Sequence, residues 1–263
     1  MRRHLEFMDE AGFASIPSAE TRPSPTVQTP FAAPQLLNEK VIPTIAPAAG
    51  DARRSMAPVR GEVQRSAAEK VSALDAIRNQ VVNCKLCRLC ETRTHAVPGE
   101  GNAAARVLFV GEGPGQTEDE LGRPFVGRAG QLLTKIIESG MGLERKDVFI
   151  ANIVKCRPPE NRDPMPDEVA ACLPYLNKQI EVIDPEVVIP LGRHSMRELA
   201  GAGERDTISR VRGKVYHLNG RAVIPTFHPA YLLRNPAEKV KVWNDIQLAM
   251  KELGIPIPKQ SKE

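Results

Sequence analysis

The sequence lacks the features that mark a membrane-embedded or exported protein. No apolar run approaches the roughly 20 residues that a transmembrane helix needs. Residues 1–10 carry five Arg, Asp or Glu side chains and no apolar core of a signal peptide. We therefore expect a cytoplasmic protein with no membrane partner, in a compartment that keeps thiols reduced.

Charge of one sign and aromatic side chains are also scarce. The net charge is only +4 and aromatic residues make up 4% of the chain, so the overall field does not by itself indicate nucleic-acid binding. The 263 residues are 41% hydrophobic and 26% charged, which is typical of a soluble globular protein and excludes a collagen-like or wholly disordered chain. Without export, the five cysteines indicate metal or cluster ligation rather than disulfides.

The N-terminal quarter of the chain differs in composition from the remainder. Residues 1–70 hold eight of the 23 prolines, and no helical or alternating period persists there. Such a segment cannot bury enough apolar surface to offset the entropy of ordering it. We expect a disordered N-terminal tail over 1–71 and a short polar tail over 257–263. An alternative for the first tail is that apolar residues at 7–8, 13 or 35–37 bind an unknown protein partner.

Residues 72–256 read as one domain in which short β-branched runs alternate with helical patterns. This predicts an α/β protein, a three-layer α/β/α fold with a central, mostly parallel sheet. In such sheets ligands bind beyond the carboxyl ends of the strands, so functional residues should follow the strands. The predicted strands are 106–110, 148–152, 186–191 and 221–225, and the predicted helices are 73–82, 129–138, 167–183, 195–200 and 238–253.

The cysteines give the first chemical signal. Cys84 and Cys87 form a C-x2-C pair, which Cys90 extends, and Cys156 and Cys172 follow far downstream. Four thiolates can hold zinc or an iron–sulfur cluster. The alternative is that the last two are buried core cysteines, but Cys156 lies in a polar, proline-containing segment, which favours a ligand. We predict a structural four-cysteine site that joins the first helix to the middle of the domain.

Two glycine loops follow the first predicted strand. Gly111-Glu-Gly-Pro-Gly115 can bring backbone N–H groups close to an anion, although a plain tight turn would show the same pattern. Gly122-Arg-Pro-Phe-Val-Gly127 holds Phe125 in a loop, where an aromatic ring can stack on a base or simply anchor the loop.

Two further polar side chains stand at strand ends. Asn152 offers one acceptor and two donors, which can pair with N3–H and O4 of uracil but not with N3 and the amino group of cytosine. His228 precedes a helical segment and can donate to a developing oxyanion. Each residue alone has a structural alternative, a turn cap for Asn152 and a buried histidine for His228. Their shared place at strand ends favours a site.

In this order, these motifs resemble the family 4 uracil-DNA glycosylases, the iron–sulfur members of the uracil-DNA glycosylase superfamily. The resemblance covers residues from about 74 to 253, and it is the ordered set, more than any one motif, that is specific. The set comprises the C-x2-C pair, the two glycine loops, Asn152-Ile-Val-Lys-Cys-Arg-Pro-Pro159, Cys172 and His228-Pro-Ala-Tyr-Leu-Leu-Arg234.

The resemblance implies hydrolysis of the N-glycosidic bond of uracil in single- and double-stranded DNA, which leaves an abasic site for base excision repair. It implies a 4Fe–4S cluster on Cys84, Cys87, Cys156 and Cys172, with Cys90 outside the pattern. It implies uracil contacts from Gly111, Glu112, Gly113, Phe125, Asn152 and His228. The Asp-Pro-Tyr-His form of the first motif, seen in the best-known uracil glycosylases, is absent here.

The chemistry of the reaction suggests further roles. We predict catalytic roles for Glu112, His228 and Asp119, with Glu118 as a third carboxylate near the water and as the group that excludes the C5 methyl of thymine. We expect Leu232 or Leu233 to enter the gap left by the flipped base. The arginines expected to contact DNA phosphates are Arg123, Arg128, Arg157, Arg162 and Arg234.

Three other functions remain open from the sequence. One is a related glycosylase of altered base specificity. The second is a non-catalytic, metal-containing module that binds nucleic acid, which would have no use for Asn152 and His228. The third is a redox protein, for which no second cluster or flavin motif is seen. We expect the protein to act as a monomer on uracil-containing DNA.

Overall fold

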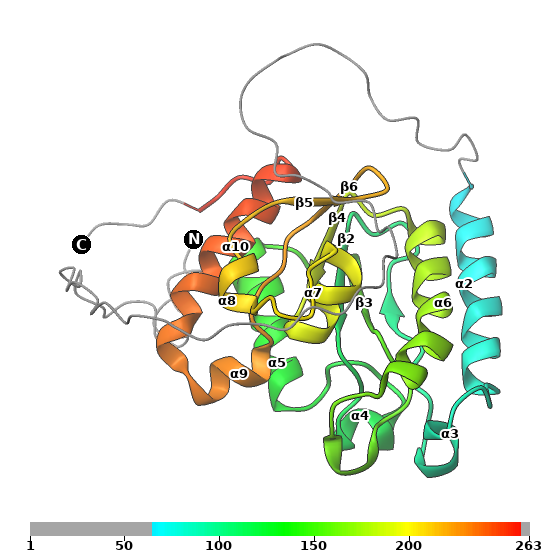
Figure 1. Ribbon diagram of the computed structural model, residues 1–263. Helices are drawn as coiled ribbons and strands as arrows, with labels where there is room; N and C mark the ends of the chain where they lie inside the picture. Colours follow the sequence, from blue (N-terminus) through cyan, green and yellow to red (C-terminus); the bar gives the residue numbers. More distant parts are fainter. Residues whose placement is uncertain (1–64, 259–263) are drawn as a thin grey trace, which may run out of the picture. The chain divides into compact units, whose positions relative to one another are not determined.

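The computed structural model describes residues 65–258 (Figure 1). Most of the two predicted tails therefore lies outside the described residues. The boundary at residue 71 is wrong, because helix α2 spans Ala67–Val82. A capping box explains the early start: the Ser66 side chain accepts from the Glu69 N–H, and the Glu69 carboxylate accepts from the Ser66 N–H. The predicted helix at 73–82 covered only the later part of this element.

The described strands form a six-stranded sheet in the order β1-β3-β2-β4-β6-β5. Its central strands β3, β2, β4 and β6 are parallel, and the edge strands β1 and β5 are antiparallel to their neighbours. The predicted mostly parallel sheet is thus confirmed, with two short edge strands added. The strands are β1 Glu100–Gly101, β2 Val107–Gly111, β3 Phe149–Asn152, β4 Val187–Pro190, β5 Tyr216–Leu218 and β6 Arg221–Val223.

Helices cover both faces of the sheet, as predicted (Figure 1). Alternate β2 side chains pack on opposite faces, Phe109 in one core and Leu108 in the other. On the Phe109 face lie α5 (Arg128–Lys135), its π-helical extension η1 (Ile136–Met141), α9 (Pro229–Arg234) and α10 (Lys239–Glu252). On the Leu108 face lie α3 (Leu89–Thr92), α6 (Pro166–Ile183) and α7 (Arg193–Ala200), with α2 packed outside α6.

The remaining helical elements are short. They are α4 (Gln116–Leu121), η2 (Arg145–Asp147), η3 (Pro159–Asn161), α8 (Ile208–Val211) and η4 (Pro236–Glu238). Among residues 65–258 there is no helix with the length and apolarity needed to cross a bilayer. Because the central strands are parallel, the segments that follow β2, β3, β4 and β6 leave the sheet at the same edge.

Candidate active site

A cavity of about 500 Å³ lies at this edge of the sheet. It is lined by residues that the sequence singled out after three different strands. Glu112 and Gly113 follow β2, Asn152 ends β3, and His228 lies in the segment after β6. Phe125, from the second glycine loop, also lines it. The structure therefore brings together side chains that are up to 116 positions apart, as the parallel sheet predicted.

Gly111 forms the floor on which two of these side chains pack. A Cβ at Gly111 would lie 2.4 Å from Asn152 Oδ1 and 2.5 Å from Phe125 Cζ. The register of the sheet explains the closeness, since Gly111 pairs directly with Asn152 across β2 and β3. Because Gly111 has no Cβ, both the amide and the ring can lie close to its Cα.

Asn152 presents an unused acceptor to this point. Its side chain is buried, and Oδ1 has no hydrogen-bond partner among the residues that the structure describes. A buried acceptor left unpaired costs about 1–3 kcal/mol, so a ligand that brings a donor to Oδ1 is favoured. The site is therefore built to receive an N–H group beside the Phe125 ring.

His228 brings a donor to the cavity. It is the N-cap of α9, and its Nδ1 accepts from the Ala230 N–H at 3.1 Å. Burial lowers the pKa of His228 to about 4, so the ring is neutral at pH 7. Since Nδ1 is the acceptor, the proton of the neutral ring is on Nε2. The ring centroids of His228 and Phe125 lie 5.6 Å apart.

Glu112 stands at the rim of the cavity beside two side chains that the motifs did not indicate. His194 Nε2 lies 3.7 Å from Glu112 Oε2 and 3.1 Å from Asp163 Oδ2. Burial, and then the charge of Asp163, raise the pKa of Glu112, although His194 and Arg193 oppose them. These three groups could hold a cation, but Arg193 also contacts Asp163 Oδ2, at 2.7 Å. The protein thus supplies positive charge here itself.

The cysteines converge in a second, smaller pocket, all five lining it together with Arg93 and Lys155. None forms a disulfide. Two N–H donors point at the thiols: Arg93 Nη1 is 2.9 Å from Cys156 Sγ, and the Lys155 backbone N–H donates to Cys172 Sγ at 3.2 Å. Burial raises the pKa of Cys172 to about 11 and also raises that of Cys156, and these donors act in the opposite sense, toward the thiolate form that metals bind. The donor set therefore fits a metal or iron–sulfur site.

The chain is similar to proteins of one known superfamily. The sequence model of the uracil DNA glycosylase superfamily matches residues 98–247. The chain is 51% identical over 172 residues to the type-4 uracil-DNA glycosylase of Sulfurisphaera tokodaii, covering 63% of this chain and 78% of that protein. It is 48% identical over 179 residues to that of Thermotoga maritima, covering 67% and 92%. The chain belongs to the type-4 uracil-DNA glycosylases. A type-5 enzyme from Pyrobaculum aerophilum is 29% identical over 188 residues, covering 60% and 83%.

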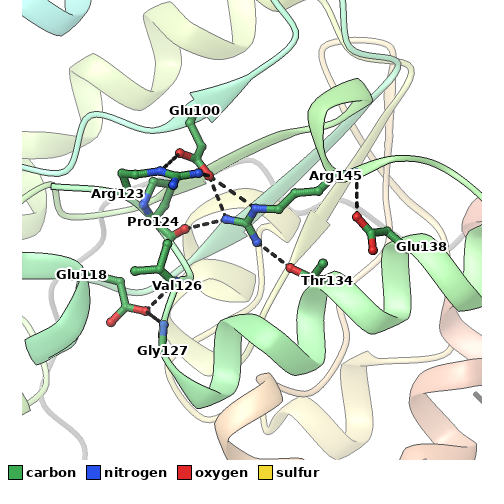
Figure 2. A network of polar contacts seen from close by, with 9 residues as sticks. All are labelled: Glu100, Glu118, Arg123, Pro124, Val126, Gly127, Thr134, Glu138 and Arg145. Atoms are coloured by element: carbon green, nitrogen blue, oxygen red, sulfur yellow. Dashed lines mark hydrogen bonds and ion pairs between the residues drawn. The ribbon is translucent and has the colours of Figure 1, made fainter. Parts of the chain in front are cut away.

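The Phe125 loop of this type-4 glycosylase is held from two sides (Figure 2). Phe125 has a φ of 51°, a left-handed conformation that costs a bulky residue about 1–3 kcal/mol and persists only where neighbours enforce it. On one side Glu118 Oε1 accepts from the Val126 and Gly127 N–H groups at 2.9 and 2.8 Å. On the other, Arg145 Nη2 donates to the Pro124 carbonyl at 2.7 Å.

Arg145 is in turn fixed by a partly buried network (Figure 2). Its Nη1 donates to Thr134 Oγ1 at 2.8 Å and its Nη2 to Glu100 Oε1 at 2.9 Å. Burial raises the pKa of Glu100, but hydrogen bonds from Arg123 and Arg145 outweigh this and hold it below its usual value. No motif in the sequence pointed to Arg145 or Glu100, because both act on the loop from outside the cavity.

The catalytic role predicted for Asp119 does not agree with its position in the structure. Its carboxylate is buried and accepts hydrogen bonds from the backbone N–H groups of Thr94 and His95, and it does not line the cavity. Neighbours on a helix point about 100° apart, so Glu118 faces the cavity and Asp119 faces away. The geometry gives Asp119 a structural role in place of a catalytic one.

The arginines that were predicted to contact DNA differ in where they lie and in which side chains they already contact. Arg162 and Arg234 line the cavity, although Arg162 is also paired with Glu168. Of the other predicted arginines, Arg123 is paired with Glu100, Arg157 hydrogen-bonds Asn161, and Arg128 is exposed. The two leucines separate clearly: Leu232 is 1% exposed and belongs to the core, whereas Leu233 is 46% exposed.

We expect Gly111→Ala to lower kcat/KM for uracil excision by roughly 10- to 100-fold, because the new methyl group would displace Phe125 or Asn152 and a 1 Å misplacement can cost that much. Excision kinetics and thermal unfolding would be measured together. Gly203→Ala is the control, since Gly203 is exposed and its added Cβ meets only Asp206 Oδ2, at 3.5 Å. Unchanged kinetics in Gly111→Ala would show that the site can accept a Cβ at this position without moving Asn152 or Phe125.

We expect Arg145→Met to lower kcat by roughly 10-fold, because the Phe125 loop loses its tether at Pro124. The Lys146→Met variant is a matched control, as Lys146 is exposed and pairs only with Glu144 among the described contacts. A loss of the same size in the control would indicate a general effect of charge removal.

Proposed function

We propose that this chain removes uracil from DNA by hydrolysing its N-glycosidic bond, leaving an abasic site for base excision repair. The observation that carries the proposal is the buried Oδ1 of Asn152, which has no hydrogen-bond partner within residues 65–258 and lies, like the Phe125 ring, close to Gly111. Membership of the type-4 uracil-DNA glycosylases supports it.

Recognition follows from the carboxamide of Asn152. Uracil presents a donor at N3 and an acceptor at O4, which match Oδ1 and Nδ2 of Asn152. Cytosine presents an acceptor at N3, which would face Oδ1 and leave both acceptors unpaired. The base reaches the cavity by leaving the helix stack, at a cost of a few kcal/mol, and the Phe125 ring would offer it a new stacking partner.

Bond cleavage uses two further polar side chains of the cavity, His228 and Glu112. As the bond between C1′ and N1 breaks, its electron pair moves to the base, and negative charge develops on N1 and O2. The Nε2–H of neutral His228 would donate to O2 as this charge appears. Water then bonds to the cationic C1′, and Glu112, whose pKa is raised, would orient it and accept its proton. Glu118, at the cavity wall, would crowd the C5 methyl of thymine.

We further propose that Cys84, Cys87, Cys156 and Cys172 hold a 4Fe–4S cluster. The convergence of these thiols with the Arg93 and Lys155 N–H donors supports this. When bound, the cluster would supply cross-linking of distant segments, not reaction chemistry. Its ligands come from the segment after α2, the segment after β3, and α6, so the site joins α2 to the strand that carries Asn152.

DNA would be bound through its phosphates. Arg162 and Arg234 at the cavity and exposed Arg128 would supply salt-dependent, sequence-independent affinity. Leu233, which is exposed, would enter the gap that the flipped base leaves.

The test uses oligonucleotides with a single uracil, in single- and double-stranded form, followed by alkaline cleavage at abasic sites. We expect strand scission of both forms, and none when thymine or cytosine replaces uracil. Strands with hypoxanthine test the alternative of altered base specificity. If the protein retards uracil strands on a gel but leaves them intact, it is a binding module and the proposed function is wrong.

For the cluster, we expect Cys156→Ser to lower bound iron and visible absorbance sharply, and to lower the thermal midpoint, because metal binding contributes directly to folding. Cys90→Ser is the matched control in the same pocket, and we expect it to keep its iron. Zinc in place of iron in anaerobic wild-type protein would refute the cluster and leave the glycosylase proposal intact.

A further inference from the structure

Lys155 is a fully buried lysine that the reaction described above does not use. Its side chain is 1% exposed, and its Nζ donates to the Asn152 carbonyl at 2.9 Å and to Gln179 Oε1 at 2.7 Å. It does not line the cavity that contains Asn152, but it does line the cysteine pocket. Lys155 therefore contacts the backbone of Asn152, outside the cavity, and also lines the pocket that holds the cysteines.

A lysine is a costly residue for this position. Taking an ammonium group out of water costs several kcal/mol, and neutral acceptors such as the Asn152 carbonyl and the Gln179 amide return only part of it. An apolar side chain of the same length would fill the space without that cost. This cost indicates that the hydrogen bonds of Nζ, and not only the volume of the side chain, are needed at this position.

The contacts of Lys155 join the two sites through α6. Its backbone N–H donates to Cys172 Sγ, and its side chain reaches Gln179, seven residues along α6. Residues seven apart lie on the same helix face. Gln179 Nε2 also donates to the Pro98 carbonyl, and the Lys155 carbonyl accepts from the Val97 N–H. Lys155 is thereby fixed at its backbone and at its tip.

We propose that Lys155 is a positioning residue: it holds the end of β3 so that the Asn152 amide faces the base, and it couples that amide to the cysteine site. The inference rests on the proposed function, since it gives Asn152 the role of reading uracil. It assigns the cysteine site an effect on base recognition, carried by the Lys155 contacts to Cys172, Gln179 and Asn152.

The test is a double-mutant cycle between Lys155→Met and Asn152→Ala in the full chain. We expect Lys155→Met to lower kcat on uracil DNA roughly 10- to 100-fold, with iron content and binding to abasic-site DNA unchanged. In the Asn152→Ala background, where there is no amide to position, the same substitution should cost little more. A purely structural role would lower activity by the same factor in both backgrounds and would also weaken binding of abasic DNA.

Controls separate the possible failures. Lys178→Met removes an exposed lysine from the same helix and should leave kcat unchanged. Wild-type protein that does not cleave uracil DNA refutes the proposed function, whereas active wild type with an equally active Lys155→Met variant refutes only this inference. If Lys155→Met does not fold, Gln179→Met enters the same cycle, because it removes the second anchor of Nζ, and additivity with Asn152→Ala then refutes the inference.

Discussion

Replacing Asn152 with alanine is expected to lower kcat/KM for uracil excision by roughly 10²- to 10³-fold. The variant removes the partners of N3–H and O4 of the flipped base, and two such losses amount to about 3–4 kcal/mol. Single-turnover kinetics on a uracil oligonucleotide would measure the loss at the chemical step. Asn177→Ala, at an exposed position of α6, is the control.

The Asn152→Asp variant tests recognition more narrowly, because it keeps the size of the side chain. An ionised carboxylate offers acceptors only, so it would repel O4 of uracil, while it could accept from the amino group of cytosine. We expect uracil excision to fall as far as in Asn152→Ala, and the ratio of cytosine to uracil excision to rise. Full activity in either variant would show that Asn152 does not read the base.

Replacing His228 with alanine is expected to lower kcat by roughly 10²- to 10³-fold, the usual cost of removing one donor to a developing oxyanion. KM should change less, because the charge on O2 appears only in the transition state. His217→Ala is the matched control, because His217 is the exposed residue of β5. A loss confined to KM would mean that His228 contributes to binding and not to charge stabilisation.

The pH profile adds a second measurement on His228. Burial lowers its pKa to about 4, so the donor form persists as the pH falls from 8 to 5, and this group should cause no loss of kcat in that range. Stability behaves differently. The pKa in the unfolded chain is about 6.5, so the unfolded state binds more protons between these values, and His228 lowers the free energy of unfolding as the pH falls from about 6.5 toward 4. His228→Ala should lack that contribution.

In this type-4 glycosylase the cysteine pocket lies close along the chain to the cavity that contains Asn152. The backbone runs from Asn152 to Cys156 in four residues, and Lys155 closes that segment on itself through the Asn152 carbonyl. Rigid support of a catalytic side chain from behind lowers the cost of holding its geometry. On this view the cysteine site acts on catalysis through rigidity and not through electron transfer.

Some of this protein was determined by its sequence alone. Buried parallel strands have continuous apolar runs, so the sequence predicted the central sheet. The carboxyl ends of such strands lie at one edge of the sheet. Asn152 and His228 could therefore be placed in one cavity without coordinates. The C-x2-C pair and the polar sequence around Cys156 likewise predicted a shared site. The structure brings all five thiols to one pocket, with Cys156 and Cys172 buried.

The tertiary structure alone decided which way neighbouring side chains point and which distant ones meet. Asp119 turns to the Thr94 backbone while Glu118 faces the cavity, and Leu233 is exposed where Leu232 is buried. The contact of Arg145 with Pro124 spans 21 residues and that of Lys155 with Gln179 spans 24. No local pattern encodes such pairs, because they depend on how whole elements pack, and packing is a property of the assembled core.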